Sequence, residues 1–347
     1  MIERLNQQTI DHISAEYARS DSPWYLGFSG GKDSSALLKL TFQALKQARK
    51  RTGELHVIYC DTGVEIPVVR SLVLRTLKGI AREAREHNLP IRTRIVSPPV
   101  ADRYFVKVLG RGYPPPTNKF RWCTDKLRIN PIKNLLLAKD SRQYVMLLGI
   151  RRGESVERDR TISRHLTSQR TFFRQSGSAN SLIFGPIVNY TTDDVWETLL
   201  HDSLPISINS ARILSLYKGA GGECPVIRED RGTPCGRGRF GCWTCTVVRK
   251  DKALTNLIKD EGYSALVPLL SFRNWLISIR DIPSYRCKWR RNGTKGLGPL
   301  TMEARREAFQ KLLECQSASG LVLITRDEIA QIRRLWKQDT NSKQYRE

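Results

Sequence analysis

The sequence contains no long hydrophobic run. No stretch of its 347 residues approaches the roughly 20 consecutive apolar residues that a membrane-spanning helix needs. The first residues, Met1 to Asn6, also lack the apolar core of a secretory signal. These two absences predict a cytoplasmic protein that has no membrane partner.

Internal repeats and long low-complexity segments are absent too, and acidic residues are scarce relative to basic ones. The chain has 34 Asp and Glu against 58 Lys and Arg, which gives a formal net charge of +24. Its length suffices for one large domain and a smaller one. A basic surplus of this size predicts affinity for polyanions, and nucleic acid is the first candidate.

The stretch from Trp24 to Ser35 organises the rest of the chain. A short apolar run predicts a buried parallel strand, Ser29-Gly30-Gly31 predicts a tight turn, and the following residues have helical character. Backbone N–H groups and the helix dipole then point at one place, which suits a phosphate. Lys32 adds a charge there, and Ser29 and Ser34 add hydroxyl groups. An ordinary strand–helix turn that tolerates glycine is the alternative.

Strands alternate with helices beyond this turn. The pattern predicts an α/β fold with a doubly wound parallel sheet, in which ligands collect at the carboxyl ends of the strands. Ser29, Asp61 and Arg151 all follow expected strands and are therefore expected at that edge. The expected strands are residues 24–28, 55–60, 91–96, 144–150 and 181–187, and the expected helices include residues 3–19 and 67–87.

Composition divides the chain into three predicted parts. Residues 1–218 form a nucleotide-binding domain, 219–250 a cysteine-rich segment, and 251–347 a basic helical C-terminal region. Within the first part, prolines between residues 97 and 131 predict a structured loop or lid. Near the C-terminus, Thr325 to Glu328 reads as a capping box that starts a helix.

Adjacent glycines with Asp33 inside the turn exclude the Walker pattern. Ser29 to Ser34 instead resembles the PP-loop of the adenine-nucleotide alpha-hydrolase enzymes, which transfer AMP from ATP to an oxygen and release pyrophosphate. Three further stretches resemble successive motifs of the sulfonucleotide (PAPS/APS) reductase branch of those enzymes: Asp61 to Gly63, Gly149 to Ser155 and Pro186 to Trp196.

This resemblance implies that the chain binds ATP with Mg²⁺. Asp61-Thr62-Gly63 suits a ribose hydroxyl or the magnesium ion, or is a plain turn. The arginines at 151 and 152 suit a bidentate phosphate contact, or form a solvated basic loop. The implied catalytic residues are Lys32, Asp33, Arg151 and Arg152. The implied nucleotide-binding residues are Ser29, Gly30, Gly31, Lys32, Asp33, Ser34, Asp61, Thr62, Gly149 and Arg151.

The eight cysteines predict metal or redox chemistry rather than disulfides in a cytoplasmic chain. Cys242 and Cys245 form a Cys-x-x-Cys unit, and with Cys224 and Cys235 just upstream they match a structural zinc site. Arg121 to Lys126, however, resembles the cluster-binding segment of the reductase branch, with Trp122 in place of the first of two adjacent cysteines. The resemblance favours a 4Fe–4S cluster on Cys123, Cys235, Cys242 and Cys245, with Cys224 as the alternative ligand. Cys60, Cys287 and Cys315 are expected to be packed or incidental.

The second half of the chain resembles the DndC family of PP-loop iron–sulfur proteins, whose counterpart in the related Ssp system is SspD. The motifs are Gly222 to Val226, Thr233 to Cys235, Arg239 to Val248 and Gly320 to Thr325. The resemblance implies a sulfurtransferase of DNA phosphorothioation, with DNA, a cysteine desulfurase and other phosphorothioation subunits as partners. Arg286 to Arg291 mixes cations with an aromatic and suits a nucleic-acid backbone, or is a solvated turn. A PAPS/APS reductase and a zinc-containing nucleic-acid-binding subunit are the alternatives.

Overall fold

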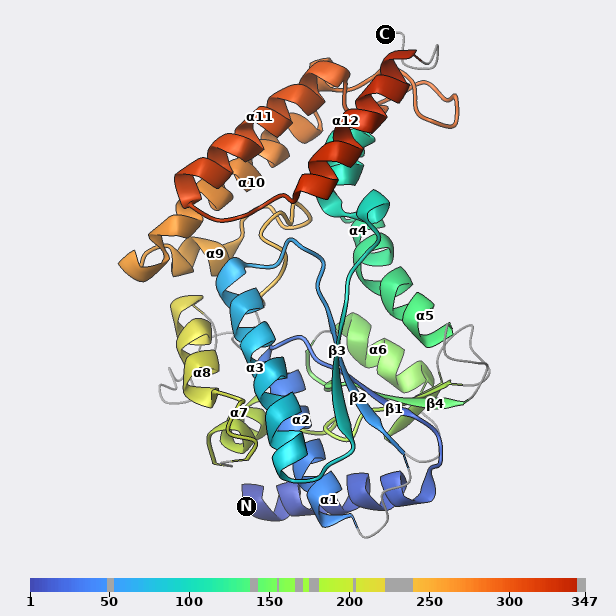
Figure 1. Cartoon of the computed structure of the whole chain (residues 1–347), viewed down its shortest axis with the longest axis vertical. Coiled ribbons are helices and arrows are strands. Elements are labelled where there is room, and N and C mark those ends of the chain that lie inside the picture. The colour runs from blue at the N-terminus through green and yellow to red at the C-terminus, as the bar shows by residue number, and fades with distance from the viewer. Residues whose placement is uncertain are drawn as a thin grey trace.

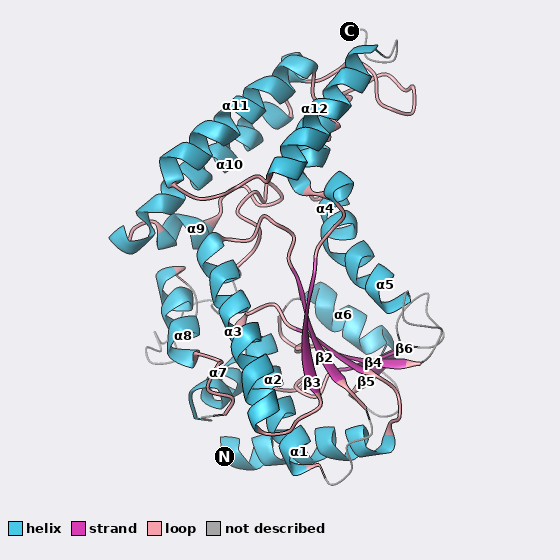
Figure 2. Cartoon of the chain, viewed as in Figure 1, coloured by secondary structure: helices cyan, strands magenta, loops and turns pink. Residues whose placement is uncertain are grey.

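A six-stranded sheet lies at the centre of the α/β part of the molecule (Figure 2). The computed structural model describes residues 1–48, 53–137, 143–154, 156–165, 171–174, 181–201, 204–221 and 240–341. The strand order is β3-β2-β1-β4-β6-β5. The strands are β1 (Trp24–Gly27), β2 (Leu55–Cys60), β3 (Ile91–Val96), β4 (Tyr144–Leu147), β5 (Phe172–Arg174) and β6 (Ser181–Phe184).

The strand order places a reversal at β1. The chain builds outward from β1 through β2 and β3, then returns to the other side of β1 with β4. All neighbouring strands pair in parallel except β5 and β6, which are antiparallel. The predicted doubly wound α/β fold is therefore confirmed, and ligands of such sheets bind where the order reverses. The short strand β5 was not predicted, because three residues carry no usable periodicity.

Helices cover both faces of the sheet (Figure 1). Ile132 and Leu136 pack on one face, against Tyr25 and Met146. The predicted helices at 3–19 and 67–87 are confirmed to within one residue. One face carries α1 (Ile2–Arg19), α2 (Lys32–Gln47), α3 (Pro67–Glu86) and α7 (Thr192–His201), and the other carries α5 (Asn130–Leu137) and α6 (Val156–His165).

The segment between β3 and β4 is largely helical, so the predicted loop or lid is wrong for most of its length. Phe105, Val106 and Leu109 are buried, because η2 packs against two helices from the far end of the chain. The prolines that suggested a loop, Pro98-Pro99 and Pro114 to Pro116, lie outside the helical pieces. These pieces are η1 (Val100–Asp102), η2 (Val106–Gly110), α4 (Trp122–Thr124) and η3 (Asp125–Ile129).

The C-terminal region is helical, as predicted. Thr325 and Glu328 form the predicted capping box at the start of α12: the Thr325 amide donates to Glu328 Oε2 (3.1 Å) and the Glu328 amide donates to Thr325 Oγ1 (3.3 Å). The buried Arg305 guanidinium pairs with Asp339 (2.7 Å) and donates to the Gly110 carbonyl (2.8 Å). The elements are α9 (Lys252–Leu257), η4 (Glu261–Leu266), α10 (Val267–Arg280), η5 (Pro283–Tyr285), α11 (Met302–Ser319) and α12 (Arg326–Asn341).

None of the helices in the described ranges is long and apolar enough to cross a membrane. Helix α8 (Ser210–Gly219) ends the first predicted part of the chain. Much of the predicted cysteine-rich segment, residues 222–239, lies outside the described residues. The predicted boundaries at 218 and 250 therefore stay predictions.

Candidate nucleotide site

The turn between β1 and α2 is closed by its own side chains. Ser34 Oγ donates to the Gly31 carbonyl (3.1 Å) and accepts from the Ser29 amide (3.2 Å). Gly30 adopts φ +73°, and a Cβ there would lie 2.2 Å from Cγ2 of Val73. A side chain at Gly30 is thus excluded both by backbone conformation and by helix α3. The turn presents the N-terminus of a 16-residue helix, as the sequence predicted.

Gly149 lies where the loop after β4 meets the turn after β1. A Cβ on Gly149 would lie 2.9 Å from the Asp33 carbonyl carbon and 3.0 Å from the Ser34 amide nitrogen. Only glycine allows the loop after β4 to approach the turn so closely. The sequence placed Gly149 in the site, and the structure gives it a steric role there.

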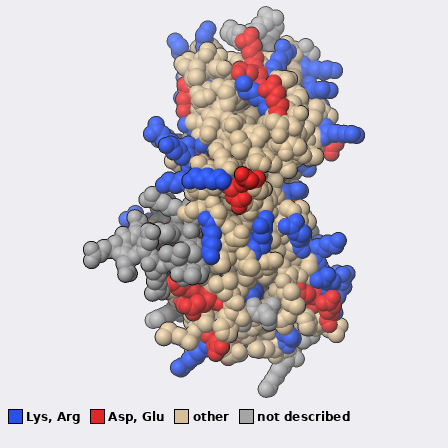
Figure 3. Space-filling model, turned by 90° about the vertical axis from the view of Figure 1, so that its left-hand side faces the viewer, with Lys and Arg blue, Asp and Glu red and all other residues tan. Residues whose placement is uncertain are grey.

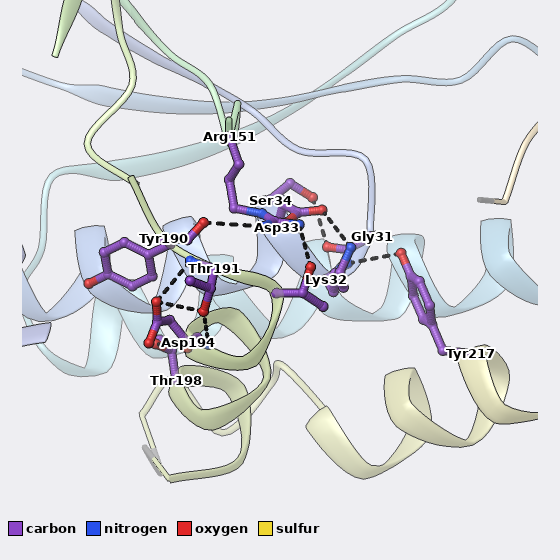
Figure 4. A network of polar contacts seen from close by, with 11 residues as sticks. Gly31, Lys32, Asp33, Ser34, Arg151, Tyr190, Thr191, Asp194, Thr198 and Tyr217 are labelled. Carbon is purple, nitrogen blue, oxygen red and sulfur yellow. Dashed lines mark hydrogen bonds and ion pairs between the residues drawn. The ribbon is translucent and has the colours of Figure 1, made fainter. Parts of the chain in front are cut away.

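Two buried cations flank the carboxylate of Asp33 (Figure 4). Lys32 Nζ lies 3.2 Å from Asp33 Oδ2, and Arg151 Nε pairs with Asp33 Oδ1. Arg151 Nη1 also donates to the Tyr190 carbonyl (3.2 Å), which fixes the guanidinium. Two cations beside a helix N-terminus form an arrangement that suits a phosphate.

Tyr217 belongs to the site although the sequence gave no sign of it. Its hydroxyl accepts from the Lys32 amide (3.3 Å), and its ring lies 5.7 Å from Lys32 Nζ (Figure 4). The ring also packs edge-on against Phe240. Tyr217 comes from α8, 185 residues beyond Lys32 in the chain, so only the tertiary fold brings the two together.

A cavity of about 470 Å³ opens beside the turn, a size typical of small-molecule sites. One wall is the turn itself, and the other comes from the end of β2 and from η3. The first wall includes Ser29, Lys32, Asp33 and Ser34, and the second includes Tyr59, Cys60, Glu65 and Arg128.

Five of the predicted catalytic and nucleotide-binding residues do not line this cavity: Gly30, Asp61, Thr62, Arg151 and Arg152. Asp61 pairs with Arg70 through both carboxylate oxygens (2.6–3.0 Å) and caps the Gly63 amide, and together with Thr62 it lines a neighbouring cavity of about 620 Å³. The side chain of Arg152 is exposed, and its amide donates to the Val188 carbonyl. Asp61 and Arg152 thus have structural partners that the motif did not reveal.

Cys242 lies beside the nucleotide edge of the sheet. The Trp243 amide donates to the Val64 carbonyl (2.9 Å), which ties the Cys-x-x-Cys segment to the loop after β2. Cys242 Sγ lies 3.8 Å from Thr62 Oγ1 and 3.7 Å from Arg128 Nη2. Burial raises the pKa of the Cys242 thiol to about 11, although the charge of Arg128 opposes this. The free thiol is therefore protonated at neutral pH.

The other predicted cluster ligands are only partly placed. Burial raises the pKa of Cys123, and the neighbouring Cys245 raises it further, so these thiols are within electrostatic reach of each other. No group of three Cys, His, Asp or Glu side chains placed to hold a metal occurs within the described ranges. Cys224 and Cys235 lie outside those ranges. The described thiols alone do not complete a ligand set, and the 4Fe–4S cluster stays a prediction.

Cys60 was expected to be packed or incidental; it is partly buried and also lines the cavity. Its Sγ donates to the Leu127 carbonyl (3.1 Å), and burial raises its pKa to about 11. Glu65 and Arg128 face the same cavity and were also missed. The acidic residue directly after β2 is Asp61, which the sequence favoured, and no local pattern singled out Glu65 four residues further on.

Comparison with known proteins identifies the family. The model of the phosphoadenosine phosphosulfate reductase domain matches residues 23–248. The chain belongs to this family. The matched residues include the whole sheet, the turn at Ser29 to Ser34 and the Cys242-x-x-Cys245 unit, so the predicted membership in the PAPS reductase-like PP-loop group is confirmed.

Individual relatives are distant. "Uncharacterized protein MJ0066" of Methanocaldococcus jannaschii is 27% identical over 206 residues, which are 59% of this chain and 37% of that protein. The PAPS reductase of Candida auris aligns at TM-score 0.37 with 11% identity, over 59% of this chain and 86% of that one. The U34-tRNA thiolase NcsA of Methanococcus maripaludis, solved with its [4Fe-4S] cluster, aligns at 0.36 with 12% identity, over 90% and 88%. The chain spans little more than a third of the curated relative it matches.

Proposed function

We propose that the chain is an ATP-dependent sulfurtransferase of bacterial DNA phosphorothioation, which replaces a non-bridging phosphate oxygen by sulfur. One observation carries the proposal: a single cavity has the PP-loop turn on one wall and, on the other, Arg128, which contacts the sulfur of Cys242. A site that activates an oxygen with ATP and then exchanges it for sulfur needs these two chemistries side by side.

In this proposal the turn binds the phosphates of ATP. The amides at the start of α2, with Lys32 and Arg151, hold the phosphate oxygens, and Mg²⁺ offsets their remaining charge. AMP is transferred to the acceptor oxygen and pyrophosphate leaves. The outer sulfur of the persulfide on a cysteine desulfurase then attacks the activated phosphorus and displaces AMP, and a thiol reductant cleaves the resulting S–S bond, which leaves sulfur on phosphorus and returns the desulfurase cysteine as a thiol. The proposed ligands of a 4Fe–4S cluster are Cys123, Cys235, Cys242 and Cys245, with Cys224 as the alternative.

A surface for the nucleic acid lies on the hairpin of residues 286–300. Trp289 is 57% exposed, and the cations at 288, 290 and 291 around it are exposed as well. Exposed aromatics among cations suit stacking on bases with contacts to phosphates. Arg286 does not take part, contrary to the prediction. It is buried and donates to the carbonyls of Gly298 (2.6 Å) and Arg280 (2.7 Å).

DNA affinity is expected to fall steeply with salt. The chain carries a net charge of +24, and on the face shown in Figure 3 basic side chains are spread over both the sheet part and the helical part. Raising salt from 50 to 200 mM should weaken binding at least roughly tenfold, because each phosphate contact releases counterions. Fluorescence anisotropy with a labelled oligonucleotide measures this. A salt-independent constant, or no binding, contradicts the prediction.

Family membership favours one second candidate, a reductase of PAPS or APS. The two candidates differ in their products. The sulfurtransferase is tested in an anaerobic assay with a cysteine desulfurase, ³⁵S-labelled cysteine, ATP and any further phosphorothioation subunits. It is expected to place ³⁵S in DNA and to release AMP and pyrophosphate. The reductase is expected to form sulfite from PAPS or APS without DNA. Sulfite formation without sulfur in DNA would overturn the proposal. Zinc without iron or sulfide in anaerobically purified protein would favour a non-catalytic binding subunit.

A further inference from the structure

Two buried polar atoms beside the cavity have no hydrogen-bond partner among the described residues. They are the hydroxyl of Tyr59 and Oε2 of Glu65. Tyr59 is 3% exposed, and both residues line the 470 Å³ cavity. Buried polar groups in folded proteins are nearly always satisfied, because each orphan costs the free energy of its desolvation. Two polar atoms without a described partner in one cavity wall point to a ligand that forms hydrogen bonds with both.

The Glu65 side chain is held in position. Its Oε1 accepts from the Thr62 amide (3.1 Å) and from Thr62 Oγ1 (2.6 Å), so the carboxyl group is fixed and Oε2 is left to form a hydrogen bond with a ligand. Burial raises the pKa of Tyr59 far above its usual value, so its hydroxyl stays neutral and can both donate and accept. The matching ligand therefore presents hydroxyl groups.

The position of the pair relative to the turn indicates which hydroxyls these are. Phosphates belong at Ser29 to Ser34, after β1, while Tyr59 and Glu65 belong to β2 and the loop that follows it. In the dinucleotide sites of Rossmann folds, whose phosphates lie on the turn after the first strand, an acidic residue near the end of the second strand binds a ribose hydroxyl. The placement of Glu65 relative to the turn is analogous. We propose that Tyr59 and Glu65 bind the ribose 2′- and 3′-hydroxyls of the nucleotide and thereby select its sugar.

This inference rests on the proposed function, because it takes ATP as the nucleotide, and it adds a rule for substrate choice. A 3′-phosphate would bring additional negative charge to Glu65 and remove a hydrogen-bond donor. The chain should therefore prefer ATP to nucleotides phosphorylated at the 3′-position, although its family is named after an enzyme of PAPS.

The test compares ATP with 2′,3′-dideoxy-ATP and with ATP that carries a 3′-phosphate, by calorimetric titration, and both analogues are expected to bind more weakly than ATP. Wild-type protein is expected to bind dideoxy-ATP roughly tenfold more weakly than ATP, as the loss of hydrogen bonds to a charged group predicts. In Glu65→Gln the difference should shrink several-fold, and in Tyr59→Phe as well. Two matched controls should retain the full difference in affinity between ATP and dideoxy-ATP. Glu54→Gln changes an acidic residue at the opposite end of β2, and Tyr25→Phe changes a buried tyrosine outside the cavity.

Stability provides a second readout that needs no nucleotide. Tyr59→Phe removes a hydroxyl without a described partner, so the Tm of the ligand-free protein should stay unchanged or rise. Tyr190→Phe, which removes a hydroxyl bonded to Asn6 (3.1 Å) and Thr9 (2.9 Å), should lower it. Equal affinity for ATP and dideoxy-ATP, or a loss of Tm in Tyr59→Phe like that in Tyr190→Phe, would overturn the inference while leaving ATP binding intact. Absence of ATP binding in the wild type would instead overturn the proposed function.

Discussion

Lys32→Ala is expected to lower the rate of ATP hydrolysis by roughly a hundredfold or more, as does the loss of other charge-stabilising groups at reacting phosphates. Lys32 is buried at the start of α2, beside Asp33 and against the ring of Tyr217. Ser34→Ala should also reduce turnover, because it removes the hydroxyl that closes the turn onto Gly31.

The measurement is release of AMP or ADP together with nucleotide affinity for each variant. Lys46→Ala is the matched control, since Lys46 lies on the exposed part of the same helix. Circular dichroism and Tm establish that the variants fold. Unchanged turnover and affinity in both Lys32→Ala and Ser34→Ala would remove the turn from the ATP site.

Cys242→Ser is expected to abolish bound iron and the brown visible absorbance that fades in air, and Cys123→Ser should do the same. The reason is that a cluster bridging Cys123 and the Cys-x-x-Cys unit depends on thiolates from both segments. Cys242 lies against Thr62 and Arg128, and Cys245 raises the pKa of Cys123, so a cluster on these thiols would lie at the nucleotide edge.

Iron, sulfide and zinc are measured on anaerobically purified protein. Cys315→Ser is the control, because Cys315 is a buried cysteine of α11 away from these groups. Full iron content in Cys123→Ser would contradict the bridging cluster. It would show that the downstream cysteines form a self-contained site.

The sequence predicted the sheet and its central turn well, because both depend on local patterns. Apolar runs marked five of the six strands, and Ser29 to Ser34 marked the turn. Lys32, Asp33, Gly149 and Arg151 were placed together correctly, since parallel strands bring their carboxyl ends to one edge.

What the sequence missed depends on contacts between distant segments. Tyr217 reaches the turn from another helix, and Asp61 is engaged by Arg70 rather than directed into the cavity. The segment between β3 and β4 reads as a loop from its prolines, yet its apolar residues are buried by helices that come 200 residues later. A local sequence pattern does not reveal whether a polar side chain has a structural or a functional role.

The packing of η2 against α11 and α12 affects the order in which parts of the chain fold. The Leu109 carbonyl accepts from Trp336 (2.7 Å) and the Gly110 carbonyl from Arg305, contacts that span 227 and 195 residues. Contacts of such sequence separation form late, and a ribosome releases the N-terminal part first. The sheet can therefore assemble during synthesis, whereas the apolar segment between β3 and β4 stays exposed until α12 has emerged. In that interval the exposed apolar surface is expected to make the nascent chain prone to aggregation.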